Sequence, residues 1–401
     1  MPLELAPGHQ IVGETRTGYW IDVSISSEKY RAFVPKPLAP YPQIALTIAD
    51  TELAGRADRS LGRLDGIADV LPDIDIFLSV WLLKEAVYSS QIEGTQSSLS
   101  DLLIFEVDGS AEAVDDLRET ANYVTAVKAA LAGLKTLPLS MRLLRDAHEC
   151  LLQSGRGSER QPGIIRTSQN WIGGSRPGTA RYVPPPTEYL GEILSDLERF
   201  LNDIPERTPL LIKAALAHAQ FETIHPFLDG NGRVGRLLVV LLLCADGALR
   251  RPLLYVSLFF KRHRDEYYSL LQRVRTDGDW EAWIRFFLEA IEQTAEQAVA
   301  SARKAMALFA GDEREIRRIA ASASGSALQV FRILQVSPIV NAPLLVKRTQ
   351  LSMPTVNTAL QLLISAGIVR ELTGRPRNRM FAYERYLTIL QEEPADDERR
   401  S

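Results

Sequence analysis

The twelve residues 225–236, HPFLDGNGRVGR, contain a titratable base, a carboxylate and two guanidinium groups. His225 is the only side chain among them that takes a proton near neutral pH, which makes it a candidate general base. Asp229 supplies a hard oxygen ligand, and one carboxylate together with substrate phosphates is the usual way in which Mg²⁺ is held. Arg233 and Arg236 are neighbours on one helix face, and their forked donors suit the outer phosphates of a nucleotide. These residue types indicate a site for phosphate-ester chemistry.

The segment that follows, residues 234–245, is apolar and too long for a typical buried strand, so it predicts a buried helix. Gly230, Asn231 and Gly232 then lie at the N-terminus of that helix. Free backbone N–H groups and the positive end of the helix dipole converge there, and glycines allow an anion to approach the backbone closely. A phosphate is the expected ligand of this turn.

Other interpretations of this stretch are a plain turn with a capping Asp229 and two solvated arginines, a P-loop and a zinc site. The first leaves the coherent chemical roles of the residues unexplained. The sequence has no Gly-x-x-x-x-Gly-Lys-Ser/Thr loop, which argues against a P-loop NTPase. No second His or Cys ligand lies at a suitable spacing from His225, which argues against zinc, and we expect the nearby His218 to be packed or to act as a cap.

The stretch resembles the signature of the Fic family, His-Pro-Phe-x-Asp/Glu-Gly-Asn-Gly-Arg-x-x-Arg, and matches it at every fixed position. Typical members of that family transfer AMP from ATP to a hydroxyl of a target protein. The resemblance implies that His225 deprotonates the hydroxyl, that Asp229 holds Mg²⁺ and that Phe227 is a buried anchor. It implies that Asn231 and the glycine amides hold the α-phosphate region, and that the two arginines hold the outer phosphates. The residues that it places at ATP in this loop are Asp229, Gly230, Asn231, Gly232, Arg233, Val234, Gly235 and Arg236.

A second segment, SSQIEG at residues 89–94, follows an amphipathic stretch and resembles the Ser/Thr-x-x-x-Glu-Gly/Asn inhibitory motif of this family. Its place before the core motif is that of the class with an N-terminal inhibitory helix, expected here at about residues 76–95. The carboxylate of Glu93 can pair bidentately with Arg236 and occupy the donors that a γ-phosphate needs. A charge-assisted pair of roughly 1.5–3 kcal/mol weakens productive ATP binding about ten- to a hundredfold. The alternative for a lone glutamate is a solvated helix end.

Two β-prone runs, residues 162–174 and 182–186, flank a turn rich in Gly, Ser, Arg and Pro and predict a hairpin. The hairpin resembles the flap of the family, along which a target segment binds by β-augmentation; an ordinary surface hairpin is the alternative. The resemblance also places four residues of the flap beside the nucleotide, namely Asn170, Trp171, Ile172 and Gly173. Residues 264–275 resemble the lining of the adenine pocket, with Tyr267 as the expected stacking ring, although paired tyrosines on a helix are more often core residues.

Composition agrees with a protein of several parts. The 401 residues suffice for two or three units of typical domain size. The 46 basic and 50 acidic side chains nearly balance, so the overall charge points neither to nucleic acid nor to a membrane. Only two cysteines, Cys150 and Cys244, are present, which fits a reducing cytoplasm. No signal peptide is visible, and the longest apolar run, residues 237–245, is too short to cross a bilayer, so we expect a cytoplasmic protein without a membrane partner.

Helical periodicity dominates residues 51–300 and predicts a mainly α fold. By resemblance, this unit is a Fic-type helical bundle that carries the β-hairpin flap. Residues 1–50 are expected to form an irregular, proline-containing extension and residues 301–322 a linker helix. Residues 391–401 predict a charged, disordered tail.

The unit at residues 323–390 shows three short helical patterns and then two strand patterns around an arginine-rich tip. It resembles a winged helix-turn-helix domain in which Ser352 or Thr355 caps the recognition helix. The tip then offers three arginines to phosphates, Arg375, Arg377 and Arg379. Residues 355–367 contain no Lys or Arg, so DNA binding and a role in dimerisation or docking are equal alternatives.

Together these features lead us to expect an autoinhibited protein adenylyltransferase that uses ATP and Mg²⁺. Its substrate is a Ser, Thr or Tyr hydroxyl of a target protein and of the enzyme itself, and a homodimer is expected because related Fic proteins often dimerise. A DNA-binding regulator that uses the Fic fold as a nucleotide sensor is the alternative. De-adenylylation and transfer of another nucleotidyl group are variants within the enzyme class. The intact base, carboxylate and arginines favour the enzyme.

Overall fold

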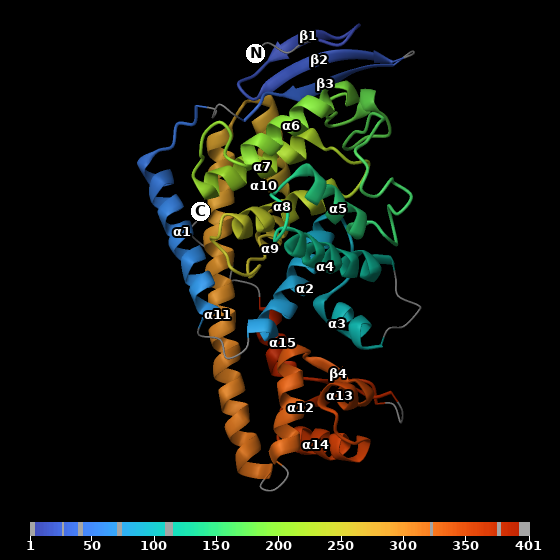
Figure 1. Ribbon diagram of the computed structural model, residues 1–401, viewed down its shortest axis with the longest axis vertical. Coiled ribbons are helices and arrows are strands. Elements are labelled where there is room, and N and C mark those ends of the chain that lie inside the picture. Colours follow the sequence, from blue (N-terminus) through green and yellow to red (C-terminus); the bar gives the residue numbers. More distant parts are fainter. Residues whose placement is uncertain are drawn as a thin grey trace.

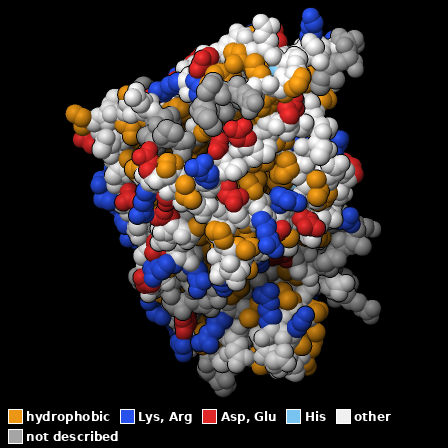
Figure 2. Space-filling model, turned by 45° about the horizontal axis from the view of Figure 1, so that its top comes forward, with side chains coloured by type: hydrophobic (Ala, Val, Ile, Leu, Met, Phe, Trp, Pro, Cys, Tyr) orange, Lys and Arg blue, Asp and Glu red, His pale blue; other side chains and the backbone are white. Residues whose placement is uncertain are grey.

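The structure, a computed structural model, describes residues 5–25, 28–38, 43–69, 74–108, 115–320, 324–374 and 378–392. It is mainly helical, as the sequence predicts. A small sheet near the N-terminus lies at one end, a group of helices fills the middle and the C-terminal unit lies at the other end (Figure 1). Basic and acidic side chains are interspersed over the face seen in Figure 2, in keeping with their nearly equal numbers. Within the described ranges, no helix combines the length and apolar character needed to cross a membrane.

Two helices, α7 (Leu210–Ile224) and α8 (Asn231–Ala245), form the centre of the molecule. Both are apolar around most of their circumference, as expected of helices buried on all sides. The helices and short 3₁₀ turns of the surrounding layer are α2 (Ile74–Ile92), α3 (Leu99–Asp108), α4 (Asp115–Gly133), α5 (Met141–Leu151), η1 (Pro177–Thr179), η2 (Thr187–Tyr189), α6 (Leu190–Leu201), α9 (Ser257–Arg262) and α10 (Arg264–Thr276). The predicted helix at 234–245 is thus confirmed, and it begins directly after Gly230.

The longest helix, α11 (Trp280–Ala320), has 41 residues and packs along α1 (Ile48–Ile67), as Figure 1 shows. The linker helix expected at residues 301–322 is therefore not a separate element. It is the final part of α11, which continues from the central helices to the C-terminal unit. Alanine-rich, uninterrupted helix-forming sequence across residue 300 explains the continuity.

The N-terminus of α1 is fixed to α11 through Asp50. Its carboxylate accepts hydrogen bonds from the backbone and hydroxyl of Thr47 at 3.0 and 2.8 Å, which forms a capping box. The same carboxylate accepts from Arg285 Nε of α11 at 2.7 Å. The hydrogen bond from Arg285 lowers the pKa of Asp50 to about 2, so the ionised form is the one that stabilises this contact.

The segment before α1 corrects one expectation. Residues 10–25 and 28–35 are not irregular but contain a three-stranded antiparallel sheet of β1 (Gln10–Glu14), β2 (Gly18–Ile25) and β3 (Glu28–Pro35), in that order. Alternate side chains such as Ile21 and Val23 of β2 are buried against Val183 and Tyr189. This period-two pattern is present in the sequence, but the prolines that follow it favour irregular chain, so the strands were not predicted. Residues 1–4 and the prolines near 39–42 lie outside the described residues.

The expected hairpin at residues 162–186 forms only in part. Its two runs pair at a single antiparallel bridge, Ile172 with Tyr182, and the chain between them contains η1. Prolines at 184–186 have no N–H to donate, which prevents the second run from extending the ladder. The segment is attached to the N-terminal sheet instead, because Phe33 N of β3 donates to Val183 O at 3.1 Å.

The C-terminal unit begins with α12 (Ser324–Val336), β4 (Ile339–Asn341), α13 (Ala342–Thr349) and α14 (Met353–Ser365). It continues with β5 (Arg370–Glu371), β6 (Met380–Ala382) and α15 (Glu384–Gln391), and its sheet has the antiparallel order β4-β6-β5. The three predicted helices and two predicted strands are present, and β4 and α15 were not foreseen. Ser352 caps α14 by accepting from Thr355 N at 3.3 Å, one of the two caps considered. The assignment of this unit to the winged-helix class stays a prediction.

Of the three arginines expected at the tip of this unit, the structure describes Arg379. Arg375 and Arg377 lie outside the described residues, as does the tail from residue 393. Arg379 faces Glu371, with 3.4 Å between Nη1 and Oε2, and its guanidinium lies over the ring of Phe381. The unit packs against the central helices through α12 on α2 and β4 on α3.

We predict that Asp50→Asn lowers the free energy of unfolding by about 1–2 kcal/mol at pH 7, since a cap and a partly exposed ion pair are lost together. This loss of stability should shrink as pH falls from about 4 toward 2. The pKa of Asp50 is lowered on folding, so its ionised carboxylate stabilises the folded state above this range and is protonated within it. Urea denaturation measures the change. Asp58→Asn, on an exposed position of the same helix, is the control and should leave the midpoint unchanged.

Candidate functional site

The loop between α7 and α8 carries the residues that the sequence singles out. It begins at His225, in the left-handed conformation with φ 50° and ψ 61°, and ends at Gly230, with φ 75°. A left-handed residue after the last helical turn, here His225, reverses the chain. Gly230 adopts the same conformation without the steric cost of a Cβ. The first turn of α8, where the sequence places Asn231 and Gly232, therefore presents its free N–H groups beside His225.

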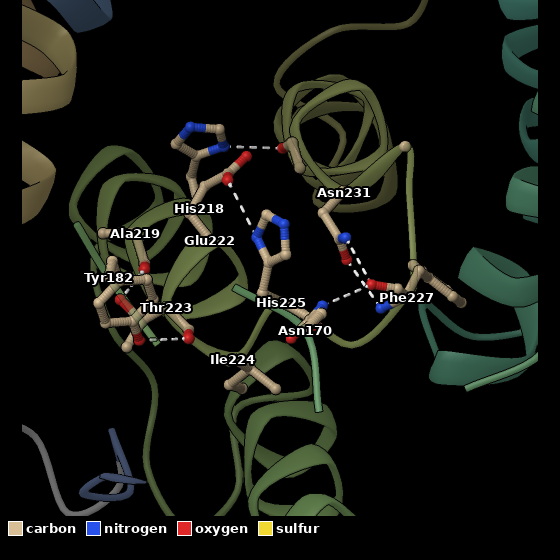
Figure 3. A network of polar contacts seen from close by, with 12 residues as sticks. Asn170, Tyr182, His218, Ala219, Glu222, Thr223, Ile224, His225, Phe227 and Asn231 are labelled. Carbon is tan, nitrogen blue, oxygen red and sulfur yellow. Dashed lines mark hydrogen bonds and ion pairs between the residues drawn. The ribbon is translucent and has the colours of Figure 1, made fainter. Parts of the chain in front are cut away.

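Two side-chain amides fix the conformation of this loop (Figure 3). Asn231 Oδ1 accepts from Phe227 N, and Asn231 Nδ2 donates to Phe227 O, both at 2.8 Å. Asn170 Nδ2 donates to Phe227 O at 2.8 Å and to His225 O at 3.2 Å. In this structure both asparagines, which the resemblance assigns to the nucleotide, bind backbone atoms of the loop itself. Phe227 is fully buried, as expected of an anchor.

His148 of α5 holds the same loop from the other side and was not foreseen from the sequence. Its ring stacks on Phe227 with 3.8 Å between ring centroids and 6° between planes. Nδ1 accepts from Gly163 N at 2.8 Å, so Nε2 carries the proton and donates to Asp229 O at 2.9 Å. Burial lowers the pKa of His148 to about 4, and the ring is neutral at physiological pH.

His225 lies in a positively charged surrounding. Arg166 Nε donates to His225 O at 2.9 Å, and Arg275 Nη2 donates to Glu222 O at 3.2 Å, so two buried guanidinium groups satisfy the last carbonyls of α7. Burial lowers the pKa of His225 to about 3, and the charges of Arg166 and Arg275 act in the same direction. The imidazole is therefore in its basic, neutral form at physiological pH. Arg275 belongs to a segment that resembles the lining of the adenine pocket, whereas Arg166 was not foreseen as part of the site.

Asp229 is the most exposed acidic group of the loop, with a side-chain exposure of 40 %. Its Oδ1 accepts from Gly230 N at 2.6 Å, which leaves Oδ2 for another partner. No group of three or more His, Cys, Asp or Glu side chains in the described ranges could hold a metal ion by itself. A lone carboxylate that faces a phosphate site fits Mg²⁺ held jointly with substrate phosphates and not an all-protein metal cage.

The two arginines of the loop are both 1 % exposed and not solvated, so the plain-turn interpretation fails. They also diverge. Arg233 Nη1 lies 3.2 Å from Glu119 Oε2 of α4, an acidic partner that the sequence did not reveal. Arg236 faces α2: Nε donates to Ser89 Oγ and Nη2 to Ser89 O, both at 2.9 Å. Each guanidinium thus reaches a different helix of the surrounding layer.

Glu93 follows the last residue of α2 and contacts Arg236, as the sequence predicts. The distance between Glu93 Oε1 and Arg236 Nη2 is 2.8 Å. The contact is through one oxygen, not bidentate as expected, and Ser89 accepts from Nε and from the same Nη2. Burial alone would raise the pKa of Glu93, but the charge and hydrogen bond of Arg236 outweigh it and lower this pKa. A Cβ added at Gly232 would overlap Glu93 Oε1, so the carboxylate lies against the first turn of α8.

Tyr267 is not placed to stack on a ligand in this structure. It is 1 % exposed, and its hydroxyl lies 2.9 Å from His218 Nε2 in an aromatic cluster. His218 in turn contacts Gly235 O through Nδ1 at 2.8 Å, which confirms the expectation that it is packed. Val234 is buried as well, whereas Trp171 is 39 % exposed. Ile172 and Gly173 lie at the start of the partial hairpin.

The fold and site thus define a mainly helical protein in which a neutral histidine precedes a glycine-containing helix N-terminus. Residues 51–132 match the family described as Fic/DOC family N-terminal, and residues 138–243 match the Fic/DOC family. The similarity to this family thus extends over nearly half of the chain.

The chain is similar to two proteins named protein adenylyltransferase Fic. The protein from Aedes aegypti is 28% identical over 245 residues, which cover 60% of this chain and 46% of that protein. The protein from Culex quinquefasciatus is 30% identical over 220 residues, which cover 53% and 40%. The match thus spans less than half the length of these relatives. A crystal structure of a Fic family protein from Desulfovibrio desulfuricans G20 has the same fold, with a TM-score of 0.55 at 19% identity over 85% of this chain and 97% of that one.

We predict that His148→Phe keeps the stacking on Phe227 but lowers the free energy of unfolding by about 2–3 kcal/mol at pH 8, because two buried hydrogen bonds are lost. This gap in the free energy of unfolding between the parent and the variant should narrow by about 1–2 kcal/mol at pH 5. The folded-state pKa of His148 is lowered, so its contribution is complete above about 6.5 and is lost as pH falls toward 4. Urea denaturation at both pH values measures the gap, and an unchanged gap would contradict a neutral, buried His148.

Proposed function

We propose that this protein is an autoinhibited adenylyltransferase that transfers AMP from ATP to a hydroxyl group of a target protein and of itself. The observation that carries the proposal is the contact of Glu93 with Arg236 beside an intact catalytic loop. The names of the similar proteins support the reaction class. The neutral state of His225 supports its role as the base.

The chemistry follows from the positions of the side chains. His225 takes the proton of the attacking hydroxyl, whose oxygen forms a bond to the α-phosphorus of ATP. The bond from that phosphorus to the bridging oxygen breaks, pyrophosphate leaves, and AMP stays on the target as a phosphodiester. The N–H groups at the start of α8 face the phosphate charge without reorganisation. Mg²⁺, when bound, neutralises phosphate charge, and Asp229 Oδ2 is the oxygen that would hold it.

Inhibition follows from competition for one guanidinium group. Arg236 is 1 % exposed, and its charge needs a partner that is already inside the protein or enters with a ligand. Glu93 supplies that partner just after α2, and Ser89 accepts from Nε and Nη2 of the same guanidinium. An outer phosphate of ATP that binds Arg236 must displace Glu93, so productive ATP binding includes the loss of this pair.

We predict that Glu93→Gly raises the rate of AMP incorporation into the protein itself about ten- to a hundredfold, because the pair of roughly 1.5–3 kcal/mol is removed. His225→Ala, made in the Glu93→Gly background, should abolish incorporation because the base is lost. Radiolabelled ATP and intact-mass spectrometry measure the adduct.

The matched control is Glu52→Gly, which makes the same change at an exposed helical position of α1 and should leave incorporation at the parent level. The proposal is wrong if Glu93→Gly and His225→Ala both label like the parent protein. A parallel incubation with GTP, UTP and CTP establishes which nucleotide is used.

Affinity provides a second, separate prediction. Glu93→Gly should lower the Kd for ATP with Mg²⁺ by about ten- to a hundredfold, whereas AMP, which has no outer phosphates, should bind both proteins equally well. Isothermal titration calorimetry measures both nucleotides. An equal gain in affinity for AMP would show that Glu93 does not act on the outer phosphates.

A further inference from the structure

Glu222, in the last turn of α7, is an acidic residue in an unfavourable place. It is 6 % exposed, and in the described part of the chain no Lys or Arg nitrogen lies within 4 Å of its carboxylate. The negative end of the dipole of α7 is at this turn, where a carboxylate is disfavoured, and burial adds to the cost. Burial raises the pKa of Glu222 to about 7, even though the nearby charge of Arg236 opposes the shift. A group retained at such cost next to a reactive histidine is a functional candidate.

The charged or titratable group in contact with this carboxylate is His225. Glu222 Oε2 lies 3.9 Å from His225 Nδ1, one helical turn later, as Figure 3 shows. His225 Nδ1 and Glu222 Oε1 are both buried without a hydrogen-bond partner in the described structure. The backbone oxygen of Glu222 also faces the ring but already accepts from Arg275 Nη2 at 3.2 Å. A carbonyl oxygen can accept two hydrogen bonds, so this backbone oxygen is the neutral acceptor near Nδ1 and the carboxylate is the charged one.

A histidine base needs one defined tautomer. To take a proton at Nε2, the neutral ring must carry its hydrogen on Nδ1, and the hydrogen bond made by Nδ1 decides this. In Figure 3 the ring lies between Glu222 and Asn231, so Nδ1 faces the carboxylate while the rest of the ring faces the first turn of α8. A small side-chain rotation shortens 3.9 Å to the 2.7–2.9 Å typical of a charge-assisted hydrogen bond.

We propose that Glu222 is a positioning residue for His225: it accepts the Nδ1–H, keeps Nε2 free as the base and stabilises the imidazolium that forms when the target hydroxyl loses its proton. This inference rests on the proposed adenylyl transfer and adds a residue to it. The proton moves from the hydroxyl to Nε2, and the carboxylate stays ionised throughout, so no further reactant is needed.

The test uses Glu222→Gln in the Glu93→Gly background, where inhibition cannot mask the result. Gln has the same size but cannot carry the negative charge. We expect kcat for AMP transfer to fall about ten- to a hundredfold, while KM for ATP stays within about twofold of the Glu93→Gly protein. Glu192→Gln, at an exposed position of α6, is the matched control and should retain full kcat. A kcat within about twofold of the parent overturns the proposal.

The pH profile of kcat/KM separates positioning from a merely structural role. Glu222 is faced by Arg236 of α8, Arg275 of α10 and Glu93 after α2, of which Glu93 is absent in the test protein. Burial raises this pKa to about 7 in the unmodified chain, and removal of the Glu93 charge lowers it in the test protein, so activity should rise with pH below neutrality as the carboxylate ionises. His225 itself stays neutral above a pKa of about 3, so the Glu222→Gln protein should be flat in this range. The same rise in both proteins contradicts the proposal.

A measurement on the unmodified chain does not depend on activity. Nitrogen NMR of protein with labelled histidine reports the tautomer of each of the five histidines, and His225 is assigned by the signal missing from His225→Ala. Protonation at Nδ1 supports the proposal, and a neutral ring protonated at Nε2 overturns it. If Glu93→Gly transfers no AMP at all, the proposed function fails, and the tautomer still decides the role of Glu222.

Discussion

The buried charge of Arg236 is the constraint on which the site depends. A guanidinium that is 1 % exposed must be paired, since an uncompensated charge in the interior costs several kcal/mol. In the described structure the end of α2 supplies the partners, Ser89 and Glu93. The same charge is suited to a phosphate. In the proposed mechanism inhibition needs no separate device, because the group that completes the interior without a nucleotide is the one that a nucleotide would replace.

The loop that precedes Arg236 is held in place by its neighbours more than by its own sequence. Asn231, Asn170 and His148 bind its backbone, and the phenyl ring of Phe227 is stacked on His148. Together these three side chains engage His225 O, Phe227 N, Phe227 O and Asp229 O. Such a loop presents the N–H groups of α8 and the ring of His225 in a fixed arrangement, which is what electrostatic stabilisation of developing charge requires.

The chemistry of the site could be predicted from the sequence because its residues are local. The base, the start of α8 and both arginines fall within residues 225–236, and Glu93 follows from one short motif. The groups that the prediction missed, such as Glu119, Arg166 and His148, come from other elements, and their relation to the site exists only after folding. The N-terminal sheet was missed for another reason: its alternating pattern was present, but prolines close to it suggested irregular chain.

The packing of α2 indicates which movement releases Glu93 most easily. From Ile76 to Ile92 no side chain of this helix is exposed, and its buried Glu85 accepts hydrogen bonds from Ser257 N at 3.1 Å and Tyr123 Oη at 3.2 Å. A shift of the whole helix would break these contacts and those with α12 as well. Glu93 lies beyond the last helical residue, retains 31 % side-chain exposure and precedes Gly94, whose φ of 104° suits glycine. Rotation of the Glu93 side chain breaks one ion pair and leaves the core intact, so it costs less free energy than movement of α2.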